Sequence, residues 1–196
     1  MKPAELIRIL KVAAALKTNT RHCQTSPGRQ ESIADHSWRI ALAAMLLSGE
    51  EEFQSVNMDK VIRMCLIHDL GEAFTGDIPS FEKNENDEKT EAALFTDWVK
   101  GFPSPQREEW LSLLCEMNAL ESREAKTYKA LDKMEAVLSH DESDISTWLP
   151  LEYQLQLEYG RDEVAFSDYF KQLKALLDDW TRRKITESRT DTPGSS

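Results

Sequence analysis

Apolar side chains recur every three or four residues along most of the chain, which predicts helices and not strands. The first such segment covers residues 3–17 and begins with a proline, a residue suited to a first helical turn. Ser32 opens a capping box and predicts the start of a second helix. This helix is so apolar over residues 40–47 that we expect it to be deeply buried. Asn57 is typical of the cap of a third helix, which we expect to stop near Gly71.

The same period predicts further helices towards the C-terminus, over residues 87–100, 105–120, 123–139, 147–159 and 167–185. Residues 18–32 have no apolar period and contain a Pro-Gly pair, so we predict a long loop there, and another over residues 74–85. We find no internal repeat and no convincing strand. The predicted fold class is all-α: a compact multi-helix bundle over residues 1–186, followed by a disordered polar tail over residues 187–196.

Composition narrows the function classes. A chain of 196 residues is long enough for one domain with a substantial core. The net charge of −11 disfavours a nucleic-acid polymer as partner, because such a surface repels phosphates. No apolar run approaches the roughly 18 residues that span a bilayer, so no membrane partner is expected. Three widely spaced cysteines indicate free thiols and a reducing, cytoplasmic location.

Candidate chemistry gathers in one stretch, LIHDLGEAFTGDIPS, which runs from Leu66 to Ser80. His68 and Asp69 are adjacent, and neighbouring helical residues point about 100° apart, so both cannot share one solvated face. The surrounding residues are mostly apolar, and a buried carboxylate must be paired or bound to a metal. The pair is therefore expected to have a partner inside the fold, whether a side chain or a metal ion.

Two further residues extend this pair to a metal-binding set. His36 lies near the start of the second predicted helix, where it is either a half-buried, hydrogen-bonded side chain or a ligand. Asp132 lies in KALDKMEAVL, where it either faces solvent, screened by a neighbouring lysine, or turns inward. Together with His68 and Asp69 they make two imidazoles and two carboxylates on three helices, a set that suits a divalent metal with open coordination positions.

The order of these residues resembles the HD-domain metal phosphohydrolases, and the local match is to their 5′-deoxynucleotidase group. The resemblance rests on ESIADHSWRIALAAML, CLIHDLGEAFTGDIPS and KALDKMEAVL, and covers about residues 6–140. It implies an all-α fold, usually a homodimer, that removes the 5′-phosphate of (deoxy)nucleoside monophosphates. It also implies one divalent metal ion per chain (Mn, Co, Mg, Zn or Fe), held by His36, His68, Asp69 and Asp132.

The resemblance also assigns roles around that metal. Glu72 would orient or deprotonate the attacking water, Asp77 would contact the substrate and support catalysis, and Arg21 would grip the phosphate. Each residue also has a plainer possible role. Glu72 could be a solvated acid at a helix end, Asp77 part of an ordinary turn, and Arg21 a cation in a surface loop. Two glycines of the stretch, at positions 71 and 76, would let the backbone turn sharply. The nucleoside pocket would be lined by Ile78, Pro79 and Ser80.

One position departs from the family. A tryptophan commonly follows the phosphate-contacting arginine there and packs against the sugar, whereas this chain has His22. His22 is either a plain exposed loop histidine or part of an altered sugar pocket. The resemblance therefore leaves the choice between deoxyribose and ribose open.

Two other functions remain open at this stage. One is a related HD phosphohydrolase that acts on nucleoside triphosphates or modified nucleotides. The other is a non-catalytic helical module that binds a metal or a nucleotide. The presence of Glu72 disfavours the second, because a sensor has no need of a residue that activates water.

Overall fold

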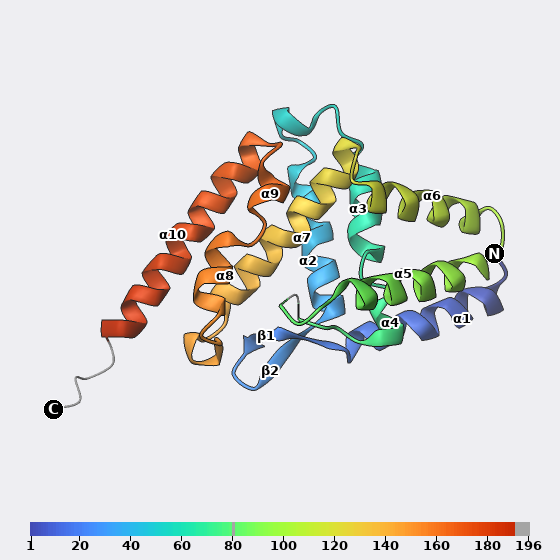
Figure 1. Ribbon diagram of the computed structural model, residues 1–196. Coiled ribbons are helices and arrows are strands. Elements are labelled where there is room, and N and C mark those ends of the chain that lie inside the picture. The colour runs from blue at the N-terminus through green and yellow to red at the C-terminus, as the bar shows by residue number, and fades with distance from the viewer. Residues whose placement is uncertain (80, 191–196) are drawn as a thin grey trace. The chain divides into compact units, whose positions relative to one another are not determined.

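The computed structural model describes residues 1–79 and 81–190, which form the mainly helical protein that the sequence predicts (Figure 1). They make two compact units. Unit 1 comprises Met1–His22 and Glu31–Tyr128, and unit 2 comprises Cys23–Gln30 and the chain from Lys129 onward. A single domain over residues 1–186 stays a prediction.

The helices of unit 1 are α1 (Pro3–Ala13), η1 (Ala14–Lys17), α2 (Ile33–Leu47), η2 (Glu51–Phe53), α3 (Met58–Ile67), α4 (Glu72–Thr75), α5 (Glu85–Lys100), α6 (Gln106–Ala119) and the start of α7 (Arg123–Glu142). Unit 2 contains the rest of α7, followed by η3 (Ile145–Thr147), α8 (Glu152–Glu158), α9 (Arg161–Val164) and α10 (Asp168–Thr190).

Residues 18–32 are not the long loop that the sequence predicts. Two strands, β1 (Thr20–Ser26) and β2 (Arg29–Ser32), form a two-stranded sheet. The turn between them contains Gly28, whose φ of +76° favours glycine. The strands carry almost no apolar side chains, so the alternation that marks a strand is missing from the sequence. The expectation of no strand was wrong, whereas the all-α class is confirmed because this sheet is small.

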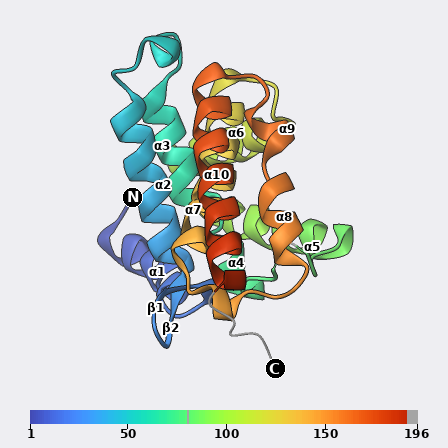
Figure 2. The same cartoon turned by 90° about the vertical axis from the view of Figure 1, so that its left-hand side faces the viewer.

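Unit 1 is built around α2 and α3, which run side by side in both views (Figures 1 and 2). Both helix starts are capped as predicted. The Ser32 hydroxyl accepts a hydrogen bond from the Asp35 amide at 3.1 Å, and the Asp35 carboxylate accepts one from the Ser32 amide at 3.0 Å. The Asn57 side chain accepts one from the Lys60 amide at 3.1 Å. These caps fix where α2 and α3 begin, and therefore which residues face the core.

Only one side of α2 is buried. Ile40 and Ala44 are fully enclosed, but four large apolar side chains of the helix are exposed: Trp38, Leu42, Met45 and Leu46. The expected deep burial of residues 40–47 was therefore wrong for half of the helix. A sequence that is apolar all round cannot say which of its faces meets the core of its own chain.

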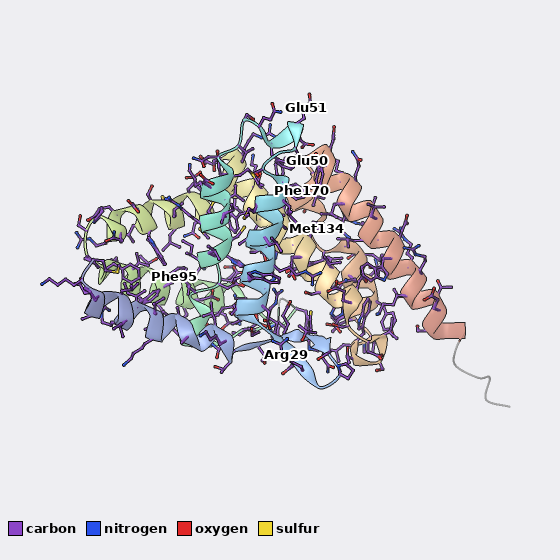
Figure 3. All side chains as sticks on the ribbon, turned by 180° about the vertical axis from the view of Figure 1, so that it is seen from behind. Arg29, Glu50, Glu51, Phe95, Met134 and Phe170 are labelled. Atoms are coloured by element: carbon purple, nitrogen blue, oxygen red, sulfur yellow. The ribbon has the colours of Figure 1, made fainter. Side chains whose placement is uncertain are left out.

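Unit 2 is held together by α7, α8, α9 and α10. Met134 of α7 and Phe170 of α10, both labelled in Figure 3, are buried in its core. The last helix continues to Thr190, so the expected disordered tail was wrong for residues 187–190. The rest of that tail, residues 191–196, lies outside the described residues. None of the helices within the described part of the chain has the length and apolar character needed to cross a bilayer.

Candidate metal centre

Three of the four expected metal ligands meet in unit 1. His36 lies in the first turns of α2, just after the capping box, and is fully buried. His68 and Asp69 lie directly after α3, which ends at Ile67, slightly earlier than the sequence predicts. The end of α3 therefore carries this pair to the beginning of α2, although the two histidines are 32 positions apart in the chain.

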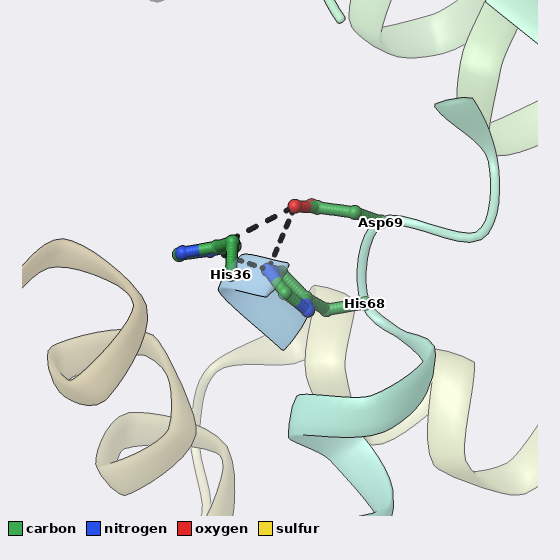
Figure 4. Close-up of side chains that lie close together, drawn as sticks. All are labelled: His36, His68 and Asp69. Carbon is green, nitrogen blue, oxygen red and sulfur yellow. Dashed lines mark hydrogen bonds and ion pairs between the residues drawn. The ribbon is translucent and has the colours of Figure 1, made fainter. Parts of the chain in front are cut away.

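The three side chains present their donor atoms to one point (Figure 4). The two histidine Nε2 atoms are 3.3 Å apart. One Asp69 carboxylate oxygen, Oδ2, lies 3.0 Å from His68 Nε2 and 3.8 Å from His36 Nε2. Ligands about 2.0–2.2 Å from a common ion and separated by tetrahedral or right angles are about 3–3.5 Å apart. The triangle of donor atoms is thus close to the size that one divalent ion requires.

The hydrogen bonding of His68 supports the same use. Its other ring nitrogen, Nδ1, lies 2.9 Å from the backbone carbonyl of Cys65, so Nδ1 must carry the proton and donate it. That tautomer leaves the Nε2 lone pair directed at His36 and Asp69. A metal-bound histidine usually donates the N–H of its other ring nitrogen to a carbonyl or carboxylate, which fixes the orientation of the ring.

Asp132, the fourth expected ligand, belongs to unit 2. It lies on α7 and is largely buried, and its carboxylate accepts a hydrogen bond from Lys129 Nζ at 2.9 Å. A lysine partner of this kind was the alternative that the sequence left open for it. Its assignment as a metal ligand stays a prediction.

Glu72 is a buried acid in the same unit, only 4% exposed, in the short helix α4. Its Oε2 atom has no hydrogen-bond partner among the residues that the structure describes. Burial raises the pKa of the Glu72 carboxyl to about 10, and the negative charges of Asp69, Asp77 and Glu91 act in the same direction. Such a group needs a nearby positive charge to ionise, which a divalent ion beside Asp69 would provide.

The sequence did not single out Lys83, Glu91 or Asn19, which support Glu72. Lys83 Nζ lies 3.8 Å from Glu72 Oε1 and donates to Glu91 at 2.6 Å. Burial opposes the Lys83 charge, but the hydrogen bond to Glu91 and the charges of Glu72 and Asp69 outweigh it, so the pKa of Lys83 is raised. The Asn19 amide donates to the Glu72 carbonyl at 2.7 Å. No sequence pattern marks these residues, because their role depends on contacts made across the fold.

Asp77 and Arg21, two residues with expected roles towards the substrate, belong to this charged group. Burial raises the pKa of the Asp77 carboxyl, Arg21 lowers it, and Asp69 raises it again. Arg21 lies on β1, with its Nε 3.6 Å from a carboxylate oxygen of the buried Glu31. Glu31 is a further residue that the sequence did not indicate, because its partner depends on the unexpected hairpin.

The expected nucleoside pocket is described only in part. Ile78 and Pro79 are half-buried in a loop that turns back through hydrogen bonds from the amides of Glu82 and Lys83 to the Pro79 carbonyl. Ser80 lies outside the described residues. His22 is half-buried, and its ring meets that of Phe81 edge-on with 6.0 Å between centroids. The plain exposed loop histidine is therefore ruled out, and a role towards the sugar stays a prediction.

The two glycines of the stretch serve different ends. Gly76 has a φ of +76°, so the backbone turns there as expected. Gly71 has a φ of −59°, which any residue can adopt, so the expected conformational role was wrong for this position. A Cβ atom at Gly71 would lie 2.7 Å from Cγ of Glu91, which makes close approach the reason for this glycine.

Comparisons with known proteins agree with this geometry. A family model described as "HD domain" matches residues 13–174, which takes in parts of both units. A mouse (Mus musculus) protein named 5′-deoxynucleotidase HDDC2 is 31% identical over 143 residues, covering 71% of this chain and 70% of the mouse protein. In Schizosaccharomyces pombe, 5′-deoxynucleotidase hdd1 is 29% identical over 144 residues, covering 69% of this chain and 71% of the yeast protein.

Solved structures share the fold. A protein from Magnetospirillum magnetotacticum MS-1, described as a "Predicted metal-dependent phosphohydrolase", is 26% identical and aligns with a TM-score of 0.77. The alignment covers 94% of this chain and 93% of that protein. The likeness extends well beyond the stretch around His68 and Asp69.

Proposed function

Because the chain belongs to the HD-domain family, we propose that it is a metal-dependent phosphohydrolase that converts (deoxy)nucleoside 5′-monophosphates to nucleoside and phosphate. The convergence of His36, His68 and Asp69 on one point, with the buried Glu72 in the same charged group, carries the proposal. The relatives named 5′-deoxynucleotidase support the choice of substrate class. The family and the metal-dependent neighbour imply a divalent metal ion in this chain.

We assign His36, His68 and Asp69 as metal ligands, with Asp132 as the fourth. A divalent ion held by these residues would supply Lewis acidity, which would polarise a phosphate oxygen and lower the pKa of water. Two imidazoles and two carboxylates suit Mn, Co, Fe and Zn, and Mg to a lesser degree, because imidazole is a borderline ligand. We propose that each chain binds one such ion.

Glu72 acts as the general base and then as the general acid. Its Oε2 takes a proton from water as the water oxygen attacks phosphorus. The bond between phosphorus and the nucleoside 5′-oxygen breaks, and that oxygen receives the proton from Glu72. The Asn19 amide holds the Glu72 backbone, and Lys83 opposes the negative charge around the carboxyl, so both keep Glu72 in position. Water and monophosphate are consumed, and nucleoside and inorganic phosphate are released.

Arg21 and Asp77 position the substrate. The Arg21 guanidinium can bind two phosphate oxygens in its planar fork, and the buried Glu31 beside it holds it in place. Asp77 orients the substrate and supports the reaction at the phosphate. In this proposal the nucleoside contacts Ile78 and Pro79, whereas Ser80, the third residue expected there, lies outside the described residues.

Phosphate release from a panel of nucleotides with added Mn²⁺, Co²⁺ or Mg²⁺ tests this function. We expect release from monophosphates such as dAMP and dCMP, and none without metal. Cleavage of triphosphates alone would support the related phosphohydrolase, and nucleotide binding without any release would support the non-catalytic module. Either result overturns the proposed activity.

His22 sets the sugar preference in this proposal. A tryptophan forms an apolar wall that leaves a 2′-hydroxyl unsatisfied, whereas an imidazole can hydrogen-bond to it. His22→Trp should therefore raise the deoxy-to-ribo ratio of kcat/KM by about tenfold, which is the equivalent of one hydrogen bond. The ratio is measured with dAMP against AMP on both proteins. A wild-type enzyme that already rejects AMP, with a ratio unmoved by the substitution, would show that another residue reads the sugar.

A homodimer is the proposed assembly, in which a second copy covers the apolar stripe of α2. Trp38, Leu42, Met45 and Leu46 are spaced so that they lie on one side of the helix, and all are exposed. Met45→Glu should convert a dimer to a monomer in sedimentation experiments, because it places a charge in an apolar contact. A wild-type monomer would contradict this assembly. Among the described residues none of the cysteines forms a disulfide, which supports a cytoplasmic location.

A further inference from the structure

Unit 2 contains a cysteine, a histidine and a glutamate in a row, apart from the residues proposed for phosphate chemistry. Cys23 Sγ, on β1, lies 3.5 Å from Nδ1 of His140 near the end of α7. The opposite ring nitrogen of His140, Nε2, lies 3.6 Å from a carboxylate oxygen of Glu152, the first residue of α8. His140 and Glu152 are 7% and 5% exposed, and Cys23 is half-buried.

Hydrogen bonds hold Cys23 beside the histidine. The buried Ser143 hydroxyl, one turn after His140, accepts a hydrogen bond from the Gln24 amide at 3.1 Å and lies 3.0 Å from the Gln24 carbonyl. This fixes the strand against the end of α7 at the residue next to Cys23. The backbone next to Cys23 is therefore held against the end of α7, within reach of His140.

Glu152 acts on His140 through its charge, because the 3.6 Å between its carboxylate oxygen and Nε2 is longer than a hydrogen bond. Its Oε2 atom accepts a hydrogen bond from the Leu149 amide at 2.5 Å, which directs the carboxylate at the ring. A carboxylate at Nε2 favours the tautomer protonated there, so Nδ1 is left as an acceptor facing the thiol. Once Nδ1 takes the thiol proton, the imidazolium is stabilised by Glu152 on one side and by the thiolate on the other.

Trp148 adds to this stabilisation. Its ring lies over that of His140, with 4.3 Å between centroids and 31° between planes. An indole face attracts a cation more strongly than a neutral ring, so the stacking favours the imidazolium form. Burial of His140 opposes the imidazolium by removing its hydration, but it also leaves few water molecules to screen the attraction to Glu152.

A metal ion does not explain the arrangement. The sulfur and the carboxylate lie against opposite nitrogens of one imidazole, so a single ion cannot bind all three groups. Thiol, imidazole and carboxylate in this order are typical of a site in which a histidine, oriented by an acid, accepts the proton of a nucleophile.

We propose that Cys23 is an activated thiol and a modification site for hydrogen peroxide and soft alkylating agents, with His140 as proton acceptor and Glu152 as positioning residue. With peroxide, the Cys23 thiolate attacks one oxygen, a sulfur–oxygen bond forms, and the oxygen–oxygen bond breaks. Sulfur is oxidised by two electrons to a sulfenic acid, and the leaving hydroxide takes up the proton held by His140 to become water. The proposal does not depend on the phosphohydrolase function.

The rate of alkylation by iodoacetamide, followed by peptide mass spectrometry from pH 5 to pH 9, tests the proposal. The exposed Cys115 of the same molecules is the internal reference. An ordinary thiol reacts with a midpoint near about pH 8.5. We expect the Cys23 midpoint to lie at least about one pH unit below that of Cys115, and Cys23 to react about tenfold faster at pH 6. We also expect dimedone to trap a sulfenic acid at Cys23 after peroxide treatment.

Matched substitutions separate activation from simple exposure. Glu152→Gln keeps an oxygen for the Leu149 amide but removes the charge, and should raise the Cys23 midpoint. Glu158→Gln makes the same change at an exposed position of α8 and should leave it unmoved. His140→Gln should move the midpoint to that of an ordinary thiol, with circular dichroism as the folding check.

Three results would overturn the proposal. The first is a wild-type Cys23 profile that coincides with that of Cys115. The second is a Cys23 that does not react in the folded protein at any pH. The third is a midpoint that Glu152→Gln and His140→Gln both leave unchanged in folded protein.

Discussion

Two buried acids, Glu72 in unit 1 and Asp141 in unit 2, differ in how far their surroundings raise the pKa of the carboxyl. Glu72 lies among Asp69, Asp77 and Glu91, with Lys83 as the opposing cation, and its pKa is raised to about 10. Asp141 is fully buried, yet burial raises its pKa only to about 6. Both acids are buried, yet Asp141 is the easier one to ionise.

The reason lies in the partners of Asp141. The Thr181 hydroxyl lies 2.9 Å from both carboxylate oxygens, and Thr181 and Gln156 both lower the pKa of the carboxyl. Lys184 and Lys174 lower the pKa further by their charge, and Lys184 also donates to the Asp141 carbonyl at 2.9 Å. Unit 2 therefore compensates its buried acid with its own side chains.

Unit 1 does the opposite. Several of its acids lie together near the point where the imidazoles of His36 and His68 converge. The cations of unit 1 do not offset their negative charge, so the pKa of Glu72 stays high. Acids that a fold leaves uncompensated are expected where a charged ligand binds, because such a cluster destabilises the protein without one. The contrast supports the proposed functional role of the acids of unit 1 and is consistent with a structural role for Asp141.

Among these predictions, removal of a proposed acidic metal ligand from unit 1 should have the largest effect on bound metal and turnover. We expect Asp69→Asn to lose bound metal and all measurable turnover, because an open site cannot spare its anionic ligand. Elemental analysis and phosphate release measure the two losses. Asp97→Asn, at an exposed position of α5, should change neither. Full metal content in Asp69→Asn would show that Asp69 is not a ligand.

Glu72→Gln should separate metal binding from catalysis. The variant should keep its metal, because Glu72 is not assigned as a ligand, and lose about 10²–10⁴-fold in kcat, the range for a general acid–base group. Glu88→Gln, on the exposed side of α5, is the matched control. Turnover at the wild-type rate would reduce Glu72 to a structural role.

Asp141→Asn should change stability in a way that depends on pH. The folded-state pKa of about 6 lies above the ordinary 3.8, so the folded protein binds the extra proton more tightly. Stability from this group is complete below about pH 4 and is lost as pH rises through 6, by about 3 kcal/mol in all. The amide removes that loss and gives up about one hydrogen bond. The variant should thus be about 2 kcal/mol more stable than wild type at pH 7 and slightly less stable at pH 4.

Urea unfolding of chelated protein at the two pH values measures this difference. Asp179→Asn, an exposed change on α10, is the control and should have little effect at either pH. The same change in free energy of unfolding at pH 4 and pH 7 would mean that Asp141 does not titrate as its surroundings indicate.

Lys83→Met should have the smallest effect of the four. It removes the cation that opposes the acids around Glu72, so Glu72 should hold its proton more tightly and act less well as a base. We expect about a tenfold loss in kcat/KM, in the range of other residues that support a metal site. Lys89→Met removes an exposed lysine of α5 and should leave the rate unchanged. An unaltered rate in Lys83→Met would show that the metal alone ionises Glu72.

Local patterns in the sequence were sufficient for the helices and for the kind of chemistry. Periodicity predicts the helices, and the caps at Ser32 and Asn57 form as their residue types predict, because a cap involves atoms only three residues apart. His68 and Asp69 are recognisable because they are adjacent in an apolar segment. Each of these inferences depends on neighbours in the chain.

The tertiary structure decided whatever depends on distant residues. It revealed the hairpin, the positions of Lys83 and Glu91 around Glu72, and the exposed side of α2, none of which has a local signature. Packing on α3 selects which apolar face of α2 is buried. The pKa of Glu72 depends on acids brought together by folding, so the same glutamate in an unfolded chain would be an ordinary acid.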